Sequence, residues 1–274
     1  MAKSYRLRSA DHRAIFRLVG ECRELGDDPG QWRDHLLGWV ARTGGCPVVN
    51  EYEAALEPKL AISGITGHGW DNSGLELPYW VAVNAVFEQR GFEYAPMFRP
   101  YFDATARGMG PCLSRPDLVA DRDWYGTEYY QLYHGPSKAD VMMYCILPQP
   151  NGRISGVVLV RPARDPDFSG RTKTIIGAAH AMIAPLIGGP LAGYAEPAPT
   201  ELSPRIRQVL KCILEGDSDK LIGARLGMAR NTVNHHVKRI YRHFRVRSRT
   251  ELMARWLSRG WGNRCAWADD LPER

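Results

Sequence analysis

The chain has 274 residues, of which 44% are hydrophobic, a length that suits about two domains with sizeable cores. Residues 200–274 carry 16 bases and 8 acids, a net charge of +8, whereas residues 1–199 carry 20 bases and 22 acids, a net charge of −2. The basic character therefore lies in the C-terminal quarter, which is typical of a small nucleic-acid-binding module attached to a neutral domain.

The start of the chain and its cysteines argue against secretion. The opening "MAKSYRLRSADHR" is charged and leads into no apolar run, so we expect a cytoplasmic protein. Six cysteines are scattered without a CxxC or any other ligand spacing, which predicts reduced thiols rather than disulfides or a zinc site. They are Cys22, Cys46, Cys112, Cys145, Cys212 and Cys265.

The first part of the chain alternates helical and strand patterns. Helices are predicted at 11–25, 31–43, 77–91 and 171–187, and strands at 46–56, 58–66, 139–147 and 153–161. Glycine-rich "GITGHGWDNSG" at 64–74 lacks the Lys-Ser/Thr and the spacing of a phosphate-binding loop, so we read it as an ordinary loop.

The last two strands enclose "PQPNG", in which Asn151-Gly152 is a strong turn dipeptide, and are expected to pair as antiparallel neighbours. Their nearly unbroken apolar character indicates a sheet covered on both faces. Helices around an antiparallel sheet of this size suit a GAF- or PAS-like sensor, so the fold class is predicted as α+β. Residues 175–195 carry no Asp, Glu, Lys or Arg and approach the length of a membrane span. Four glycines, two prolines and His180 interrupt them, so we expect a core helix and no membrane partner.

Aromatic residues gather in this domain and indicate either a small-molecule pocket or an ordinary core. The candidates for ligand contact are Trp80, Tyr101, Trp124 and Tyr129. No GxSxG, HExxH or paired-cysteine signature is present, and the acids of a phosphoacceptor receiver domain are missing. We therefore expect neither an enzyme nor a cofactor.

A Gly- and Pro-rich stretch without helical period, "GGPLAGYAEPAPTELS", predicts an exposed linker. The predicted organisation is a sensor domain at 1–187, a linker at 188–201, an all-α domain at 202–260 and a C-terminal tail at 261–274. In the all-α domain Ser203 and Pro204 mark the start of the first helix, and Ser218 caps the second.

The third helix, in "GMARNTVNHHVKRIYRHF", has an apolar stripe formed by Val233, Val237, Ile240 and Phe244. Its other side is basic and contains no acid. A solvated helix normally mixes charges of both signs, whereas a helix that meets a polyanion has reason to carry one sign. Two short helices joined by a tight Gly-containing turn predict a helix-turn-helix.

Residues 202–257 contain a set of specific motifs: "LSPR" at 202–205, "RLG" at 225–227, "RIY" at 239–241 and "VRSRTEL" at 246–252. With these motifs the stretch resembles the LuxR-type helix-turn-helix domain. It implies four helices, the third in the major groove of double-stranded DNA and the fourth in a homodimer interface. The implied base contacts are Asn234, His235 and Lys238, the implied backbone contacts are Arg230, Asn231, Thr232 and Arg242, and the implied dimer contacts are Leu252, Met253 and Trp256.

Some positions depart from the family. Ile206 and Leu221 replace usual acids. Gly223 replaces a usual alanine, and Ala229 a usual Ser or Thr cap, each at a cost of about 1 kcal/mol. His235 and His236 point away from each other on the wheel, so no metal is expected.

Residues 123–171, "DWYGTEYYQLY…GRISGVVLVRPARDPDFSGR", resemble the GAF-like input region of some LuxR-type regulators. Two functions follow. One is a dimeric transcription regulator that binds a two-half-site operator through 229–244 and responds to a small-molecule effector, including an autoinducer-type ligand. The other is an adaptor whose first domain binds a protein and whose helix-turn-helix only localises it.

Overall fold

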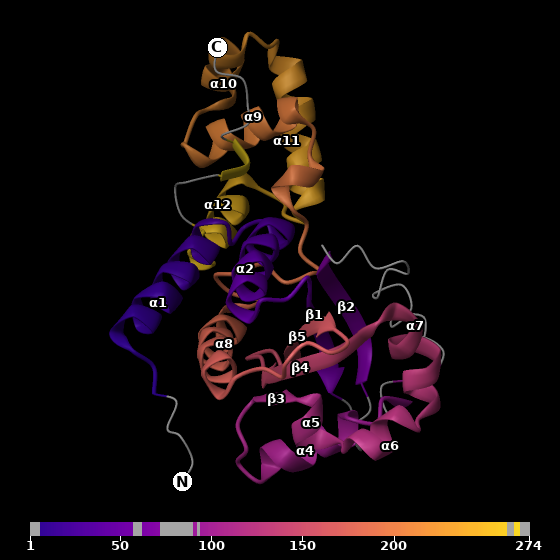
Figure 1. Cartoon of the computed structure of the whole chain (residues 1–274). Coiled ribbons are helices and arrows are strands. Elements are labelled where there is room, and N and C mark those ends of the chain that lie inside the picture. Colours follow the sequence, from indigo (N-terminus) through magenta and orange to yellow (C-terminus); the bar gives the residue numbers. More distant parts are fainter. Residues whose placement is uncertain (1–5, 57–61, 72–89, 92–93, 262–265, 269–274) are drawn as a thin grey trace. The chain divides into compact units, whose positions relative to one another are not determined.

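The structure, a computed structural model, describes residues 6–56, 62–71, 90–91, 94–261 and 266–268. The chain divides into two compact units (Figure 1). One comprises Met1–Val19 and Arg33–Pro185, and the other comprises Gly20–Trp32 and Leu186–Arg274. Among the described residues, no helix is long and apolar enough to cross a membrane.

The first unit is built on a sheet with helices around it. Its strands are β1 (Val48–Leu56), β2 (Ile62–Asp71), β3 (Cys112–Ser114), β4 (Ala139–Pro148) and β5 (Arg153–Pro162). Its helices include α1 (Ser9–Glu24) and α2 (Pro29–Gly44), which both continue into the second unit, and α8 (Gly170–Ile183), followed by the 3-10 turn Ala184–Leu186. The shorter ones are α4 (Phe98–Ala106), α5 (Arg115–Leu118), α6 (Asp121–Tyr125), a π-helical turn at Tyr130–His134 and α7 (Gly135–Ser137).

The five strands lie in the order β2-β1-β5-β4-β3, and all neighbours are antiparallel. The predicted hairpin is confirmed, since β4 and β5 pair from Ala139↔Pro162 to Pro148↔Ile154. Gly152 in its turn has a φ of 78°, a left-handed conformation that favours glycine.

Both faces of the sheet are covered, which explains the nearly unbroken apolar strands. On one face lie α2 and α8. An added Cβ at Gly44 of α2 would contact Leu159 of β5 and Ile176 of α8, and one at Gly177 of α8 would contact Cys112 of β3. On the other face, Tyr52 and Val158 join a core with Phe98 and Trp124 from the shorter helices. The α+β prediction is confirmed.

The other expectations for this unit fare differently. Helices predicted at 11–25 and 31–43 correspond to α1 and α2. The loop expected at 64–74 is wrong over residues 64–71, because these belong to β2 and pair with β1. Backbone pairing tolerates glycine at this edge strand, so a glycine-rich pattern does not exclude a strand. The helix predicted at 77–91 lies almost entirely outside the described residues.

The second unit is all-α. It contains a 3-10 turn (Pro199–Glu201), α9 (Pro204–Leu214), α10 (Asp219–Leu226), α11 (Arg230–His243), α12 (Arg249–Ser258) and a 3-10 turn (Ala266–Ala268). Ser203 precedes α9 with Pro204 in its first turn, and the Ser218 side chain accepts a hydrogen bond from the backbone N–H of Leu221, so both predicted helix starts are confirmed.

The exposed linker is a wrong expectation for several residues. Leu191, Ala192 and Ala198 are buried, and the backbone N–H of Leu191 donates to Leu186 O (3.0 Å). The carboxylate of Glu196 accepts bonds from Arg255 and Arg259. Glycine and proline predict the absence of a helix but say nothing about burial.

The described residues of the stretch 261–274 pack into the second unit. Trp261 and Trp267 belong to the core of the second unit. The indole N–H of Trp267 donates to Asp27 Oδ2 (2.6 Å), and that of Trp32 donates to Ala192 O (3.0 Å). The stretch Gly20–Trp32 is therefore bonded to the C-terminal part of the chain.

Candidate nucleic-acid interface

Helix α11 presents one apolar and one polar side, as its sequence period requires. Val233, Val237 and Ile240 are buried in the core of the unit, and Phe244 caps the end of the same stripe. The predicted stripe is confirmed by these four burials. The opposite side of α11 is consequently held outward by the packing of the whole helix.

All seven residues implied as DNA contacts are exposed. They are Arg230, Asn231, Thr232, Asn234, His235, Lys238 and Arg242. Within the described part of the chain, none of these side chains makes a hydrogen bond or an ion pair. Arg239, which the sequence reasoning passed over, is exposed on the same side and equally without such a partner. Its place on the helical wheel, one residue after Lys238, was the signal that could have found it.

Several arginines elsewhere in the unit are engaged with carboxylates. Arg225 bridges Glu215 and Asp217, the latter at 2.9 Å. Arg249 binds Asp219 at 2.8 Å. Because the framework arginines use these acids, the bases on the outward side of α11 keep their full charge for an external partner.

The turn between α10 and α11 depends on two glycines. Gly227 ends α10 with φ 62° and ψ 41°, and its N–H donates to Gly223 O. A Cβ at Gly223 would lie 2.9 Å from Met228 O, inside normal contact distance. The glycine at 223 therefore permits the tight turn, which offsets the helix-propensity cost expected from the sequence.

The start of α11 lacks a side-chain cap. Ala229 occupies the N-cap position with extended backbone, φ −66° and ψ 147°, and offers no side-chain acceptor. This matches the departure noted in the sequence. The first N–H groups of the helix remain without a protein side-chain partner, in the region where the helix dipole favours negative charge.

The histidines of α11 do not converge on one point. His235 is exposed and His236 is half-buried, with ring centroids 6.1 Å apart. Burial, followed by the charges of His235, Arg239 and Arg205, lowers the pKa of His236. His243 donates from Nε2 to Ala198 O at 2.9 Å, which uses that nitrogen internally.

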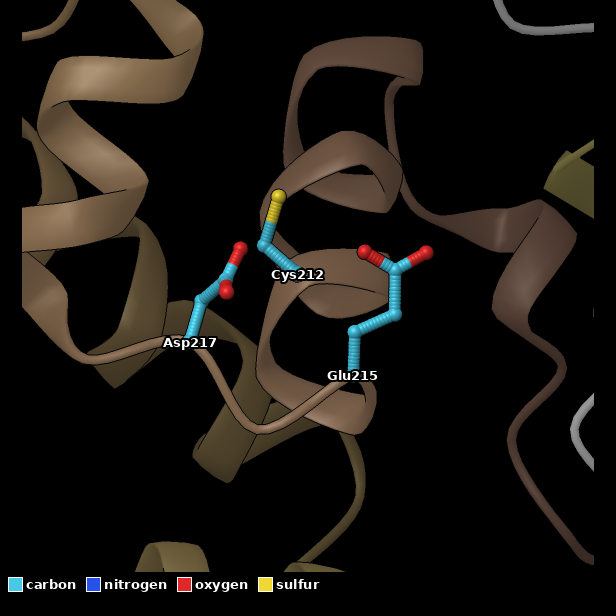
Figure 2. A group of neighbouring side chains, drawn as sticks. All are labelled: Cys212, Glu215 and Asp217. Atoms are coloured by element: carbon cyan, nitrogen blue, oxygen red, sulfur yellow. The ribbon is translucent and has the colours of Figure 1, made fainter.

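Another group of potential metal ligands lies at the end of α9. Figure 2 shows Cys212, Glu215 and Asp217, whose ligand atoms lie within 4.8 Å of one another. Arg225 binds both carboxylates, so a cation would have to displace its guanidinium. Burial raises the pKa of the Cys212 thiol, which opposes the thiolate that a metal needs. The group fits an arginine bridge better than a metal centre.

The implied dimer face is largely covered by the chain itself. Leu252 and Trp256 are buried, and Trp256 packs edge-to-face on Phe244 and Trp261 with centroids 5.5 and 5.0 Å apart. Both side chains are covered because residues outside the helix, among them Trp261, pack against this part of it. Met253 is half-buried, and Leu257, one turn later, is 70% exposed.

The predicted ligand residues that the structure describes are buried in the aromatic core of the first unit. Trp124 donates from its indole to Asp140 Oδ1 (2.7 Å), and Tyr125 donates to the other oxygen (2.6 Å). Tyr101 accepts from the backbone N–H of Ile146 (2.7 Å). Tyr129 packs edge-to-face on Trp124 at 5.9 Å. Trp80 lies outside the described residues.

Comparison with known proteins identifies the basic unit. Residues 200–256 match the family described as bacterial regulatory proteins, luxR family. This stretch is a LuxR-type helix-turn-helix domain. It contains α9 to α11 and most of α12, and its third helix is the one that carries the unpaired bases. The members of this family are transcription regulators and not enzymes.

Solved structures over the longer chain are similar only at low identity. SdiA from Escherichia coli is 14% identical over 83% of this chain and 91% of its own, with a TM-score of 0.41. CepR2 from Burkholderia cenocepacia, an N-acylhomoserine lactone dependent LuxR family factor, is 11% identical over 62% of this chain and 90% of its own, with a TM-score of 0.39. No curated protein matches the chain.

Proposed function

We propose that this chain is a cytoplasmic transcription regulator that reads double-stranded DNA with α11 and binds a two-half-site operator as a homodimer. The observation that carries the proposal is the outward side of α11, where polar and basic side chains are exposed and have no hydrogen-bond or ion-pair partner in the described chain. Charges of one sign on one helix face do not stabilise a folded domain. They do favour the binding of a polyanion to that face.

The side chains on this face divide into two chemical groups. Asn234, His235 and Lys238 lie near the middle of the helix, and their amide, imidazole and ammonium groups can bond to base edges in the major groove. Arg230 and Arg242 lie near the two ends, where groove walls bring phosphates close. The first group would choose the sequence, and the second would set affinity for any DNA.

Alanine variants at positions of the two groups test this division. Lys238→Ala and Asn234→Ala should each weaken binding to a selected operator by about 1–3 kcal/mol and relax the preference at particular base pairs. Arg122→Ala is the charge-matched control, because Arg122 is exposed in the first unit and pairs with its neighbour Asp123. Binding to the operator and to scrambled DNA is measured side by side.

If both variants keep the affinity and the base preference of the wild type, α11 does not read the groove. The adaptor function, in which the domain only localises the protein, would then be the better account. An unchanged control beside a weakened Lys238→Ala variant supports the proposal.

A homodimer would use the part of α12 that the chain leaves open. Met253 and Leu257 are one turn apart on the same side, so they share a face. Leu257→Glu should therefore weaken self-association and binding to a two-half-site operator while the melting temperature stays unchanged. Leu221→Glu is the matched control, since Leu221 is 51% exposed on α10. Sedimentation equilibrium reports the association; equal dimer formation in both variants would contradict this interface.

The first unit would respond to a small-molecule effector. Its aromatic core between the sheet and the shorter helices supports this role, because such side chains commonly line apolar ligand sites. A ligand that binds the folded state must raise the melting temperature, and the rise must increase with the logarithm of its concentration above the Kd. A metabolite panel tested by thermal shift, with operator binding measured in parallel, would identify it. If no compound changes the melting temperature or the operator binding, the first unit does not respond to these metabolites, and a protein partner is the better account.

A further inference from the structure

Two cysteines face each other across neighbouring strands of the sheet. In the register of β3 and β4, Cys112 lies directly opposite Cys145. Directly opposite residues of antiparallel strands have Cα atoms about 4.5–5.5 Å apart, and their side chains lie on the same face. Disulfides span Cα separations of about 4.4–6.8 Å. A disulfide between Cys112 and Cys145 therefore requires no change in the spacing of the two strands.

The two thiols differ in access. Cys145 is fully buried, whereas Cys112 retains 8% exposure at the edge strand of the sheet. Gly177 of α8 makes room for the Cys112 sulfur: a Cβ at that glycine would lie 3.3 Å from it. A small oxidant would therefore meet Cys112 first, with Cys145 behind it.

His180 lies against the Cys145 thiol, and its hydrogen bonds fix which ring nitrogen carries the proton. His180 of α8 places Nδ1 3.3 Å from Cys145 Sγ and Nε2 2.9 Å from Ser155 Oγ. Ser155 donates its single hydroxyl proton to Glu51 Oε1 at 3.0 Å. The serine oxygen can then only accept from the histidine, so Nε2 carries the proton and Nδ1 is a bare acceptor aimed at the thiol.

The arrangement ends in a buried ion pair. Arg33 Nε binds the other oxygen of Glu51 at 2.8 Å. This guanidinium keeps Glu51 an acceptor, which fixes the direction of every bond in the series. Burial lowers the pKa of His180 to about 4, so the imidazole is neutral near pH 7 and its Nδ1 can accept a hydrogen bond from the Cys145 thiol.

We propose that Cys112 and Cys145 form a peroxide-sensitive dithiol that closes to a disulfide between β3 and β4, with His180 as the base for Cys145. In the first step the sulfur of Cys112 attacks hydrogen peroxide and the O–O bond breaks. Cys112 is oxidised to the sulfenic acid, and the leaving hydroxide takes the proton of the Cys112 thiol and departs as water. In the second step Cys145 gives its proton to His180 Nδ1, and its sulfur attacks Cys112 Sγ. The S–O bond breaks, and the leaving hydroxide takes the proton from His180 as a second water.

This role requires that Cys145 does not react before Cys112 has been oxidised. The surroundings of Cys145 meet this requirement. Burial, and next the neighbouring Cys112 thiol, raise the pKa of Cys145 well above its usual value. The inner thiol therefore stays protonated until Cys112 has been oxidised. Cys112, Cys145 and His180 are not among the described groups whose ligand atoms converge as a metal site would require.

The full reduced chain treated with hydrogen peroxide tests the proposal. The intact mass should fall by the two hydrogens of one disulfide, and peptide mapping should find Cys112 joined to Cys145. In Cys145→Ser, Cys112 should stop at the sulfenic acid and be trapped by dimedone. In His180→Asn, which retains an acceptor near the Nδ1 position but has no base, closure should slow by about a hundredfold.

Cys46→Ser is the matched control, because Cys46 is a buried thiol that donates to the backbone carbonyl of Gly44, and this variant should oxidise as the wild type does. Mapping of the wild-type chain needs no variant, so a variant that fails to fold leaves the test intact. Two free thiols at 112 and 145 after peroxide treatment of the folded chain would overturn the proposal. So would oxidation of Cys22, Cys46 and Cys212 at the same rate.

Discussion

The outward side of α11 and the aromatic core of the first unit are both rich in groups that can bind a partner, yet the chain treats them in opposite ways. The seven candidate DNA contacts on the outward side of α11 are exposed and make no hydrogen bond through their side chains within the described chain. In the aromatic core, the indole of Trp124 and the hydroxyl of Tyr125 are bonded to Asp140. Exposed polar groups without internal hydrogen bonds are available to an external partner. Buried polar groups that are hydrogen-bonded within the chain contribute first to the stability of the fold.

The largest expected effect comes from breaking the buried side of this comparison. Trp124→Ala should lower the free energy of unfolding by about 3–5 kcal/mol through the cavity it leaves. It also leaves one oxygen of buried Asp140 without its donor, at a further cost of about 1–3 kcal/mol. His235→Ala, on the outward side of α11, should change stability by no more than about 0.5 kcal/mol. Urea titrations of both variants measure the contrast; equal losses would remove it.

Buried and exposed carboxylates differ in the same way, and a buried carboxylate makes the free energy of unfolding depend on pH. Burial raises the pKa of Asp27 from 3.8 to about 7, although the Trp267 indole opposes the shift. The folded state therefore holds this proton more tightly than the unfolded state. Its contribution is fully present below about pH 4 and is lost as pH rises to about 7, a change of roughly 4 kcal/mol.

Asp27→Asn isolates this term, because the amide oxygen can still accept from Trp267 but does not titrate. The stability of the wild type relative to the variant should fall as pH rises through that window. Glu128→Gln is the control, since Glu128 is exposed and pairs with Arg90. A constant difference between wild type and Asp27→Asn at all pH values would show that Asp27 keeps an ordinary pKa.

The smallest of these effects concerns the cap of α11. Ala229→Ser places a hydroxyl where the backbone is already extended, and it should raise stability by about 1 kcal/mol. Ser218→Ala is the converse, because the Ser218 hydroxyl accepts from Leu221 N at 3.3 Å, and it should lose a similar amount. Thermal melts compare the two. If Ala229→Ser raises the melting temperature without any change in base preference, the cap of α11 contributes to stability and not to the recognition of DNA bases.

Local pattern was sufficient where one element decides the outcome. The stripe of Val233, Val237 and Ile240 follows from a period of 3.6 residues, so the orientation of α11 could be predicted. Asn151-Gly152 likewise predicted the β4–β5 hairpin, because that dipeptide suits its turn. The candidate DNA contacts were implied by the family resemblance, and all seven lie on the exposed side of α11.

Long-range packing could not be predicted in the same way. Nothing near Trp256 in the sequence indicates that Trp261 and Trp267 will cover the same core. The bond between Asp27 and Trp267 joins residues 240 positions apart, and no local period encodes it. Burial of Leu191 in a glycine- and proline-rich stretch is a third case, since composition reports flexibility of the chain and not its contacts.

The most direct test of the central claim is the salt dependence of DNA binding. Each base that neutralises a phosphate contributes about one unit to the slope of log affinity against log salt. Arg242→Ala should therefore reduce that slope by about one unit and weaken binding to all sequences alike, whereas Arg122→Ala should leave it unchanged. If the slope of Arg242→Ala equals that of the wild type on both operator and scrambled DNA, the outward side of α11 does not meet DNA.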